Sequence, residues 1–388
     1  MIQPPGLGSC SCLFISLSCL SSTSFAGRCG KMYLKYIVFF VFVTASLLLN
    51  AFMPSKIIDQ IQMITVIGFD ATEEERVQGT VASPKYQQEG QVEDFIYTDT
   101  ADTVYEDWVK LNAKATERLL NGKIKVVFYN QKLAAEGISD FIGFLTRDPS
   151  IGGNVSLAVT EGSTLDVINS ATTTKGRGIF FADLFEHNIR HGNLPQINLK
   201  IFESALDSGT QDPFLPMLSI EKERPALTAI AFFKGDQYVD KLPIEHADVF
   251  KMLYEKNVSD GEYQYKSEEY IAAVENIETT KDVVFETNGG SGTVTINVNI
   301  RGAVREFTGQ LPTTQKEKIE RDIKQDIEKK ANRLVSRFQE LEIDPLGIED
   351  DIKSGNRTYN QKHFKSAYPD MPIRVNAEVK ITGYGIMR

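Results

Sequence analysis

The chain has no cysteine after Cys29. All four of its cysteines lie within the first 31 of 388 residues: Cys10, Cys12, Cys19 and Cys29. The rest of the chain therefore cannot form internal disulfides, and it offers no thiol nucleophile or thiolate metal ligand. A chain of this size buries an adequate core without crosslinks, so the absence does not weaken the fold.

Histidine is also scarce, with four in the sequence. His187 and His191 lie four positions apart next to Glu186, and positions four apart share one face of a helix, so these two imidazoles could bind one zinc ion. The order Glu-His-x-x-x-His is not the zincin order, however, and His246 and His363 belong to the second half of the chain. Partly exposed histidines without metal are the simpler interpretation.

Other motifs of catalysis are missing or incomplete. The sequence has no Gly-x-Ser-x-Gly, and the run from Lys175 to Gly178 lacks the leading glycine of a phosphate loop, so it indicates a turn before a helix. The acidic run Glu349-Asp350-Asp351 has a polar, loop-like context. The residues therefore predict no active site, metal or cofactor.

Basic residues are outnumbered by acidic ones, and the net charge is −10. The first 53 residues contain three basic residues and no acids, so the remainder carries −13. A surface of that sign repels phosphate backbones and anionic headgroups, which argues against nucleic-acid binding and against contact of the folded part with lipid.

One segment is suited to a membrane. After Lys35 the chain is apolar from Ile37 to Leu49, the arrangement of a signal peptide or an anchor. Residues 37–53 would cover about 25 Å as a helix, which is marginal for a hydrocarbon core of about 30 Å. Because the small-x-small cleavage pattern is poor, we expect residues 32–53 to remain as an anchor. Its candidate apolar contacts are Ile37, Phe40, Phe42, Leu47 and Leu49.

Residues 1–31 precede this segment and contain no acids. A disulfide or metal cluster formed by their four cysteines is one interpretation. The other is an untranslated or non-native extension, with Met32 as the start, and we favour it.

The first half of the folded part alternates strands and helices without a regular βαβ period. Strands are expected at 60–68, 76–84, 93–101, 123–130 and 154–162. Helices are expected at 104–119 after an Asp102 cap, 133–136, 139–147 after a Ser139 cap, 163–171, 178–192 and 194–209. The only tryptophan, Trp108, is assigned to the core. This mixture predicts an α+β fold.

Turn-forming residues cluster from Asp207 to Pro216, where we place a domain boundary. The expected domains are 54–206 and 217–388, the second with a possible last subdomain at about 281–388. The second half predicts a strand before Lys234, a turn at 234–236, a return strand and a helix at 244–254. A hairpin at about 282–304 and a last strand from residue 373 follow.

The longest expected helix runs from Thr313 to Glu342. Six apolar residues form one stripe along it: Ile319, Ile323, Ile327, Leu334, Phe338 and Leu341. Such a stripe usually covers an antiparallel sheet. A coiled coil with a partner is the alternative, since Ile327, Leu334 and Leu341 repeat every seven residues, but Glu320 ends this repeat.

The order of the segments carries a resemblance. A strand "MITVIGFD" is followed by "GISDFIGFLTRDP" from Gly137 to Pro149, then by "AIAFFKGDQYVDKLPIE" from Ala229 to Glu245, the hairpin, the long helix and "VNAEVKITGYG". Together these resemble the Ger(x)C family, the C subunits of nutrient germinant receptors in endospore-forming bacteria. The resemblance covers residues 37–388.

The resemblance implies a non-enzymatic subunit on the outer face of the spore inner membrane, beside polytopic A and B subunits. Family members usually carry a lipid-modified cysteine, and in this register that position is Phe52. No thioether-linked lipid can form there, so the peptide itself or its partners must hold the chain at the membrane. Lys241 replaces a common glycine, from which we expect only a changed turn. A free-standing membrane-tethered solute-binding or sensor protein is the alternative function, and a zinc-dependent hydrolase is a third.

Overall fold

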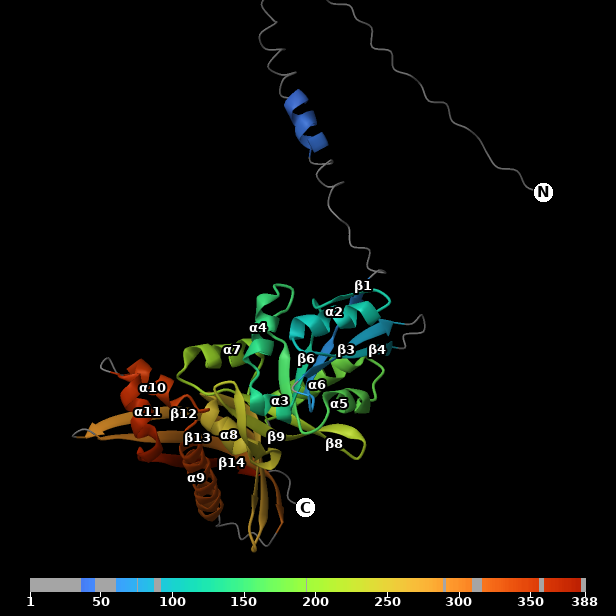
Figure 1. Cartoon of the computed structure of the whole chain (residues 1–388). Helices are drawn as coiled ribbons and strands as arrows, with labels where there is room; N and C mark the ends of the chain where they lie inside the picture. Colours follow the sequence, from blue (N-terminus) through green and yellow to red (C-terminus); the bar gives the residue numbers. More distant parts are fainter. Residues whose placement is uncertain are drawn as a thin grey trace, which may run out of the picture. The chain divides into compact units, whose positions relative to one another are not determined.

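The computed structural model describes residues 36–45, 61–74, 76–86, 92–192, 194–288, 291–308, 316–355 and 359–384. The chain divides into two compact units, Met1–Ile58 and Asp59–Arg388. In the first unit the described part is an exposed helix over residues 36–45. Every other element belongs to the second unit, which is α+β with several sheets and packed helices, as the sequence predicts (Figure 1).

An eight-stranded sheet with the order β10-β9-β8-β7-β6-β2-β3-β4 forms the first part of the second unit. Its four central strands run parallel to one another, and each end is extended by two antiparallel strands. The strands are β2 (Val66–Ala71), β3 (Val77–Tyr86), β4 (Val92–Ala101), β6 (Val126–Asn130), β7 (Ser156–Thr160), β8 (Phe214–Glu221), β9 (Arg224–Lys234) and β10 (Gln237–Pro243).

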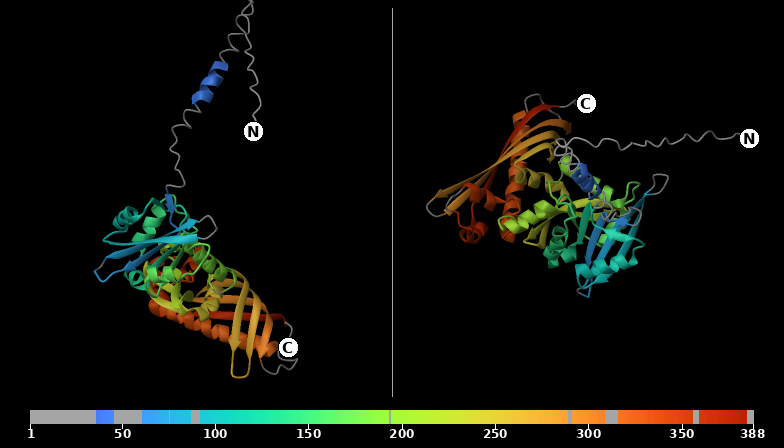
Figure 2. Two further views of the ribbon diagram at one scale, coloured as in Figure 1. Left: turned by 90° about the vertical axis from the view of Figure 1, so that its right-hand side faces the viewer. Right: turned by 90° about the horizontal axis from the view of Figure 1, so that it is seen from above.

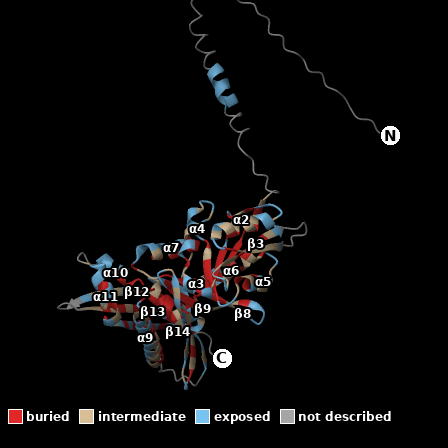
Figure 3. Ribbon diagram, in the orientation of Figure 1, coloured by how far each residue is buried: buried red, intermediate tan, exposed pale blue. Residues whose placement is uncertain are grey.

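The central strands are almost continuously apolar because helices cover both faces of the sheet (Figure 2). On one face Phe69 of β2 packs against Phe141, which belongs to α4 (Ser139–Arg147). On the other face Phe128 of β6 meets Phe181 of α6 (Arg177–Arg190) edge to face at 4.8 Å. Buried residues are concentrated in these strands (Figure 3).

Five further helices accompany this sheet in the described chain. They are α2 (Val104–Lys114), α3 (Gln131–Glu136), α5 (Thr164–Ser170), α7 (Leu199–Ser208) and α8 (Ala247–Tyr254), the last preceded by the 3-10 turn η2 (Ile244–His246). Three of these elements lie within about two residues of the predicted bounds: α3, α5 and the helix at 244–254. Helix α7 begins at Leu199, later than the predicted start at residue 194.

Two expectations near α2 were wrong. The helix ends at Lys114 rather than Leu119, because Arg118–Leu120 forms strand β5 and pairs in parallel with β1 (Ile61–Met63). Its cap is Thr103 rather than Asp102, since the Thr103 hydroxyl accepts from the Glu106 N–H. The strand predicted at 60–68 is likewise two strands, and the second continues past Gly68 to Ala71. Trp108 is half-buried and packs against the core, as expected.

The second part of the unit is a four-stranded sheet with the order β11-β12-β13-β14. Its strands are β11 (Asn257–Lys266), β12 (Ile271–Asn288), β13 (Ser291–Thr308) and β14 (Ile373–Tyr384). The first three are antiparallel and β14 runs parallel to β13. Val294, Ile296, Val298 and Ile300 are buried on one face, as the alternation predicts.

Helix α9 (Lys316–Leu341) covers that buried face (Figure 1). Of the predicted stripe, five residues are buried and Leu341 packs at the edge of the core. The stripe is therefore used within the chain, as the sheet-covering interpretation predicts. Glu320, which ends the seven-residue repeat, accepts a hydrogen bond from the Ile381 N–H of β14 at 2.7 Å.

Three phenylalanines join the two sheets. Phe232 of β9 lies between Phe250 of α8 and Phe338 of α9, with ring centroids 5.1 Å and 4.8 Å away. All three rings are at most 2% exposed. The core is thus continuous from the eight-stranded sheet to the long helix.

Several described elements were not predicted: β8, β11, α10 (Ile348–Gly355), α11 (Gln361–Ala367) and the 3-10 turn η3 (Tyr368–Asp370). The predicted domain boundary at 207–216 covers the end of α7, the loop after it and the start of β8. Strands β8, β9 and β10 belong to the same eight-stranded sheet as the strands before this boundary. The loop expected for Glu349-Asp350-Asp351 is wrong, because these residues form the first turn of α10.

Candidate functional site

The sequence-predicted anchor residues are only partly described. Ile37, Phe40 and Phe42 lie on the helix over residues 36–45 and are 59%, 70% and 72% exposed. Leu47, Leu49 and Phe52 lie outside the described residues. Among the helices described, none has the length and apolar content needed to span a bilayer.

The predicted histidine pair lies at the end of α6. The rings of His187 and His191 are 4.7 Å apart, and His191 faces Asp260 at 3.9 Å. Glu186 pairs with Arg190 on the same helix. Within the described ranges no three His, Cys, Asp or Glu side chains gather where they could hold a metal ion.

The glycine-containing run before α6 is a turn, as predicted. Gly176 caps the helix with φ at +90°, a conformation that favours glycine. The buried carboxylate of Asp94 accepts from the Arg177 N–H at 3.0 Å and from its guanidinium at 3.2 Å. A carboxylate of the protein itself therefore occupies the anion position at this helix N-terminus.

The two motifs that carry the family resemblance meet in space. The turn between β9 and β10, residues 234–237, packs on the loop between α3 and α4. The Ile138 N–H donates to the Asp236 carbonyl at 3.2 Å, and the Ser139 N–H donates to its carboxylate at 3.1 Å. The predicted Ser139 cap of α4 is thus wrong: Ile138 is the cap residue, and Asp236 supplies the acceptor.

Gly137 is required at this contact. Its φ is +120°, and a Cβ there would lie 2.8 Å from the Asp236 carboxylate. Only glycine allows both the backbone conformation and the close approach. Lys241, where a changed turn was expected, instead lies within β10 opposite Ala231 and pairs with Glu161 at 2.5 Å.

The same turn also contacts the segment after α9. We call this junction the seam, and it is formed by Asp212, Lys234, Gly235, Glu342 and Asp344. Asp212 accepts from the Gly235 N–H at 2.9 Å and from the Asp344 N–H at 2.8 Å, and its own N–H donates to the Asp344 carbonyl at 3.1 Å. Lys234 pairs with Glu342 at 2.8 Å. One aspartate thus bonds both the β9–β10 turn and the segment after α9.

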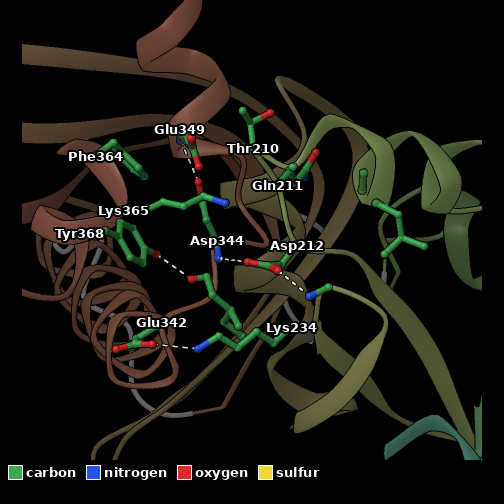
Figure 4. A pocket seen from close by; sticks show the side chains of 15 residues that line it. Thr210, Gln211, Asp212, Lys234, Glu342, Asp344, Glu349, Phe364, Lys365 and Tyr368 are labelled. Atoms are coloured by element: carbon green, nitrogen blue, oxygen red, sulfur yellow. Dashed lines mark hydrogen bonds and ion pairs between the residues drawn. The ribbon is translucent and has the colours of Figure 1, made fainter. Parts of the chain in front are cut away.

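A cavity of about 380 Å³ lies at the seam (Figure 4). Its lining comes from the end of α7, the β9–β10 turn, the segment after α9, and helices α10 and α11. The polar lining includes Thr210, Gln211, Asp212, Lys234, Glu342, Asp344, Glu349 and Lys365, and the apolar lining includes Ala205, Leu206 and Phe364. Sequence reasoning missed it, because these residues are spread over residues 205–368.

Two buried carboxyl groups line the cavity. Glu349 is 3% exposed and accepts from the Tyr359 hydroxyl. Asp344 is 6% exposed; its Oδ2 accepts from the Glu349 N–H at 2.7 Å, whereas Oδ1 has no hydrogen-bond partner in the described structure. Burial raises the pKa of Asp344 to about 7, and the charges of Asp212 and Glu349 act in the same direction.

Two family models match the chain in succession. The first, described as "Spore germination protein N-terminal domain", matches residues 54–220, and the second, "Spore germination B3/ GerAC like, C-terminal", matches residues 228–385. The spore germination protein GerQC of Bacillus cereus is 29% identical over 354 residues, which cover 89% of this chain and 98% of that protein.

Two further similarities agree with these matches. The putative spore germination protein YfkR of Bacillus subtilis strain 168 is 23% identical over 316 residues, which cover 75% of this chain and 79% of that protein. The crystal structure of the GerBC protein has the same fold, with a TM-score of 0.56 at 13% identity over 81% of this chain and 96% of that one. The chain therefore belongs to the Ger(x)C family of spore germination proteins.

Proposed function

We propose that the chain is the non-catalytic C subunit of a nutrient germinant receptor and is needed for spore germination. One observation carries the proposal: both family models match in order, and the match to GerQC covers 98% of that relative. The similarity therefore extends over the whole folded part rather than one module. The partners in this proposal are the polytopic A and B subunits, and the location is the outer face of the spore inner membrane.

The proposal includes a membrane attachment without lipid. Residues 32–53 serve as the anchor, with Ile37, Phe40 and Phe42 among the residues that contact hydrocarbon. Phe52 occupies the position of the lipid-modified cysteine, so the peptide segment or the partner subunits retain the protein. Residues 1–31 are an extension outside the functional chain, and the domains remain 54–206 and 217–388, with a possible subdomain at about 281–388.

The packing of the folded part supports a role as a rigid binding scaffold. The β9–β10 turn is hydrogen-bonded to the α3–α4 loop, to the segment after α7 and to the end of α9. These bonds join the eight-stranded sheet to the segment after α9, and a subunit whose parts are joined in this way can present a pre-organised surface to its partners.

Affinity purification from gently solubilised spore inner membranes tests the proposal. The tagged protein should co-purify with two polytopic subunits, and its N-terminus, read by mass spectrometry, should be Met32. An untagged strain controls for non-specific recovery. Spores that lack the gene should lose the fall in optical density that follows addition of a nutrient, and the plasmid-borne gene should restore it.

Two results together would contradict the receptor role: recovery of the tagged chain without polytopic subunits, and normal germination of spores that lack the gene. Saturable binding of a nutrient by the isolated chain in that case would support the alternative, a free-standing membrane-tethered solute-binding or sensor protein.

A further inference from the structure

The cavity at the seam has the size and lining of a small-molecule site. Its volume of about 380 Å³ exceeds by far the roughly 30 Å³ share of one water molecule. Small-ligand sites typically occupy a few hundred Å³ and combine apolar walls with a few placed polar groups. Leu206, Ala205 and Phe364 supply such walls here, and the acidic side chains supply the polar groups.

The charge of the lining selects the ligand class. Four carboxyl groups line the cavity, against two lysines, and one of these lysines, Lys234, is already paired with Glu342 at 2.8 Å. A carboxylate or phosphate ligand would be repelled by this excess of acids, whereas a cation would be attracted.

One of the lining residues, Asp344, has an acceptor oxygen without a partner in the described structure. Its Oδ1 has no hydrogen-bond partner among the described residues, and the residue is buried, with 6% of its surface exposed. A buried carboxylate oxygen without a donor is costly, so a ligand that brings a donor to Asp344 would be stabilised there. Figure 4 shows Asp344 between Glu349 of α10 and Asp212 of the segment after α7, to which its backbone is hydrogen-bonded. A donor at Asp344 therefore lies near groups from both sides of the seam.

We propose that this cavity binds a small organic cation whose primary ammonium group donates to Asp344 and whose hydrocarbon part packs against Leu206 and Phe364. An ammonium group fits because it carries three donors and a positive charge in a compact head. The ligand contacts segments on both sides of the seam, so its binding stabilises the junction between the eight-stranded sheet and the C-terminal elements.

Isothermal titration calorimetry on the full chain in detergent tests the proposal, with n-butylammonium as the probe and 1-butanol as the uncharged control. The expected result is saturable binding of n-butylammonium, at least about tenfold tighter than that of 1-butanol. Equal binding of the two compounds, or no saturation by n-butylammonium at about 100 mM, would overturn it.

Two variants locate the site. Asp344→Asn keeps the side-chain size and should weaken n-butylammonium binding about tenfold or more. The exposed Asp282→Asn on β12 is the matched control and should leave binding unchanged. Equal affinity of folded Asp344→Asn and wild-type protein would overturn the assignment.

A third variant keeps the test valid if Asp344→Asn does not fold. Ala205→Leu places a larger side chain at the apolar wall of the cavity and leaves the four carboxyl residues unchanged. It should abolish binding of n-butylammonium and retain that of methylammonium, because the longer chain loses its place. Unchanged n-butylammonium binding in this variant would place the ligand elsewhere and overturn the proposal.

Discussion

Asp236 caps a helix that begins at Ser139, 97 positions earlier in the chain, by accepting the Ser139 N–H with its carboxylate at 3.1 Å. The cap residue of that helix, Ile138, has no side chain that can accept a hydrogen bond. The first free N–H groups of a helix need such acceptors. The cap therefore comes from another segment and ties the β9–β10 turn to α4.

Replacement of Asp236 by Ala should destabilise the protein by about 0.5–2 kcal/mol, the usual cost of losing a helix cap. Urea unfolding followed by circular dichroism measures the change. Asp236→Asn is the matched control, since its amide oxygen can still accept, and it should cost less. Equal losses of stability in the Ala and Asn variants would show that the missing hydrogen-bond acceptor does not cause the destabilisation.

Asp107 should make stability depend on pH. Its carboxyl lies against Gly79, whose N–H donates a hydrogen bond to it. Burial and, to a smaller extent, the charge of Asp99 raise the pKa of Asp107 to about 7, although Lys110 and Lys114 act in the opposite direction. Below the ordinary value of 3.8 the carboxyl is protonated in both the folded and unfolded states. As the pH rises from there towards 7, the unfolded state releases the proton first. The free energy of unfolding therefore decreases over this pH range.

Asp107→Asn removes the ionisation and should therefore stabilise the protein by roughly 1–3 kcal/mol at pH 8, with little effect at pH 4. Thermal unfolding of wild type and variant at both pH values measures this. Asp140→Asn, at an exposed position of α4, is the control and should show no such difference between pH values. A gain of the same size at pH 4 and pH 8 would contradict the pKa assignment.

Asn332 should protect the outer edge of β14. Its Oδ1 accepts from the Val375 N–H at 3.0 Å and its Nδ2 donates to the Val375 carbonyl at 3.4 Å, so helix α9 supplies the pairing that a neighbouring strand would give. Asn332→Ala should cost about 1–3 kcal/mol because it leaves both groups unpaired.

Hydrogen exchange reports this effect locally: the Val375 amide should exchange faster in Asn332→Ala. Asn376→Ala is the control, because Asn376 is exposed and, within the described residues, its side chain bonds to Asn297 alone, at 3.4 Å. An unchanged exchange rate of the Val375 amide would mean that Asn332 of α9 does not protect this edge of β14.

Phe338 should be essential for holding α9 on the eight-stranded sheet. It is 1% exposed, and its ring lies 4.8 Å from Phe232 and 6.1 Å from Phe250. Phe338→Ala should cost about 3–5 kcal/mol because it leaves a cavity where the two sheets join. The exposed Glu340→Ala on the same helix should change the urea midpoint little. A small loss in Phe338→Ala would show that the two parts are held mainly by the seam.

Phe52→Cys should permit lipid attachment if Phe52 is the lipobox position. Leu49 and Ala51 supply the leucine and the small residue of that consensus. Mass spectrometry of the variant, produced in a strain that modifies other lipoproteins, should find the mass of a diacylglycerol. Ala51→Cys is the matched control and should remain unmodified, and an unmodified Phe52→Cys would refute the register.

Much of the fold follows from the sequence because its elements carry strong local patterns. The apolar stripe of α9 and the alternation in β13 each point to one buried face, and both faces are buried in the structure. The turn at residues 234–236 was found from its Lys-Gly-Asp composition. Local periodicity was enough in these cases since each element has a single covered side.

The elements that were missed have patterns that depend on their neighbours. Strand β8 contains Pro216 and follows Pro213, so its start suggested a turn; it is buried by β7 and β9 on either side. Helix α10 has Glu349 buried through a bond from Tyr359, which no local pattern shows. The cavity at the seam depends on such long-range pairings, so it could not be derived before the fold was known.

The position of β14 has a genetic consequence. This strand is the last of the described elements, and α9 is bonded to it through Glu320, Glu328 and Asn332. A stop codon shortly before residue 373 would remove less than a twentieth of the chain, yet it would expose the long helix and one edge of β13. Termination just before β14 should therefore disrupt the packing of α9 and β13, although it removes few residues.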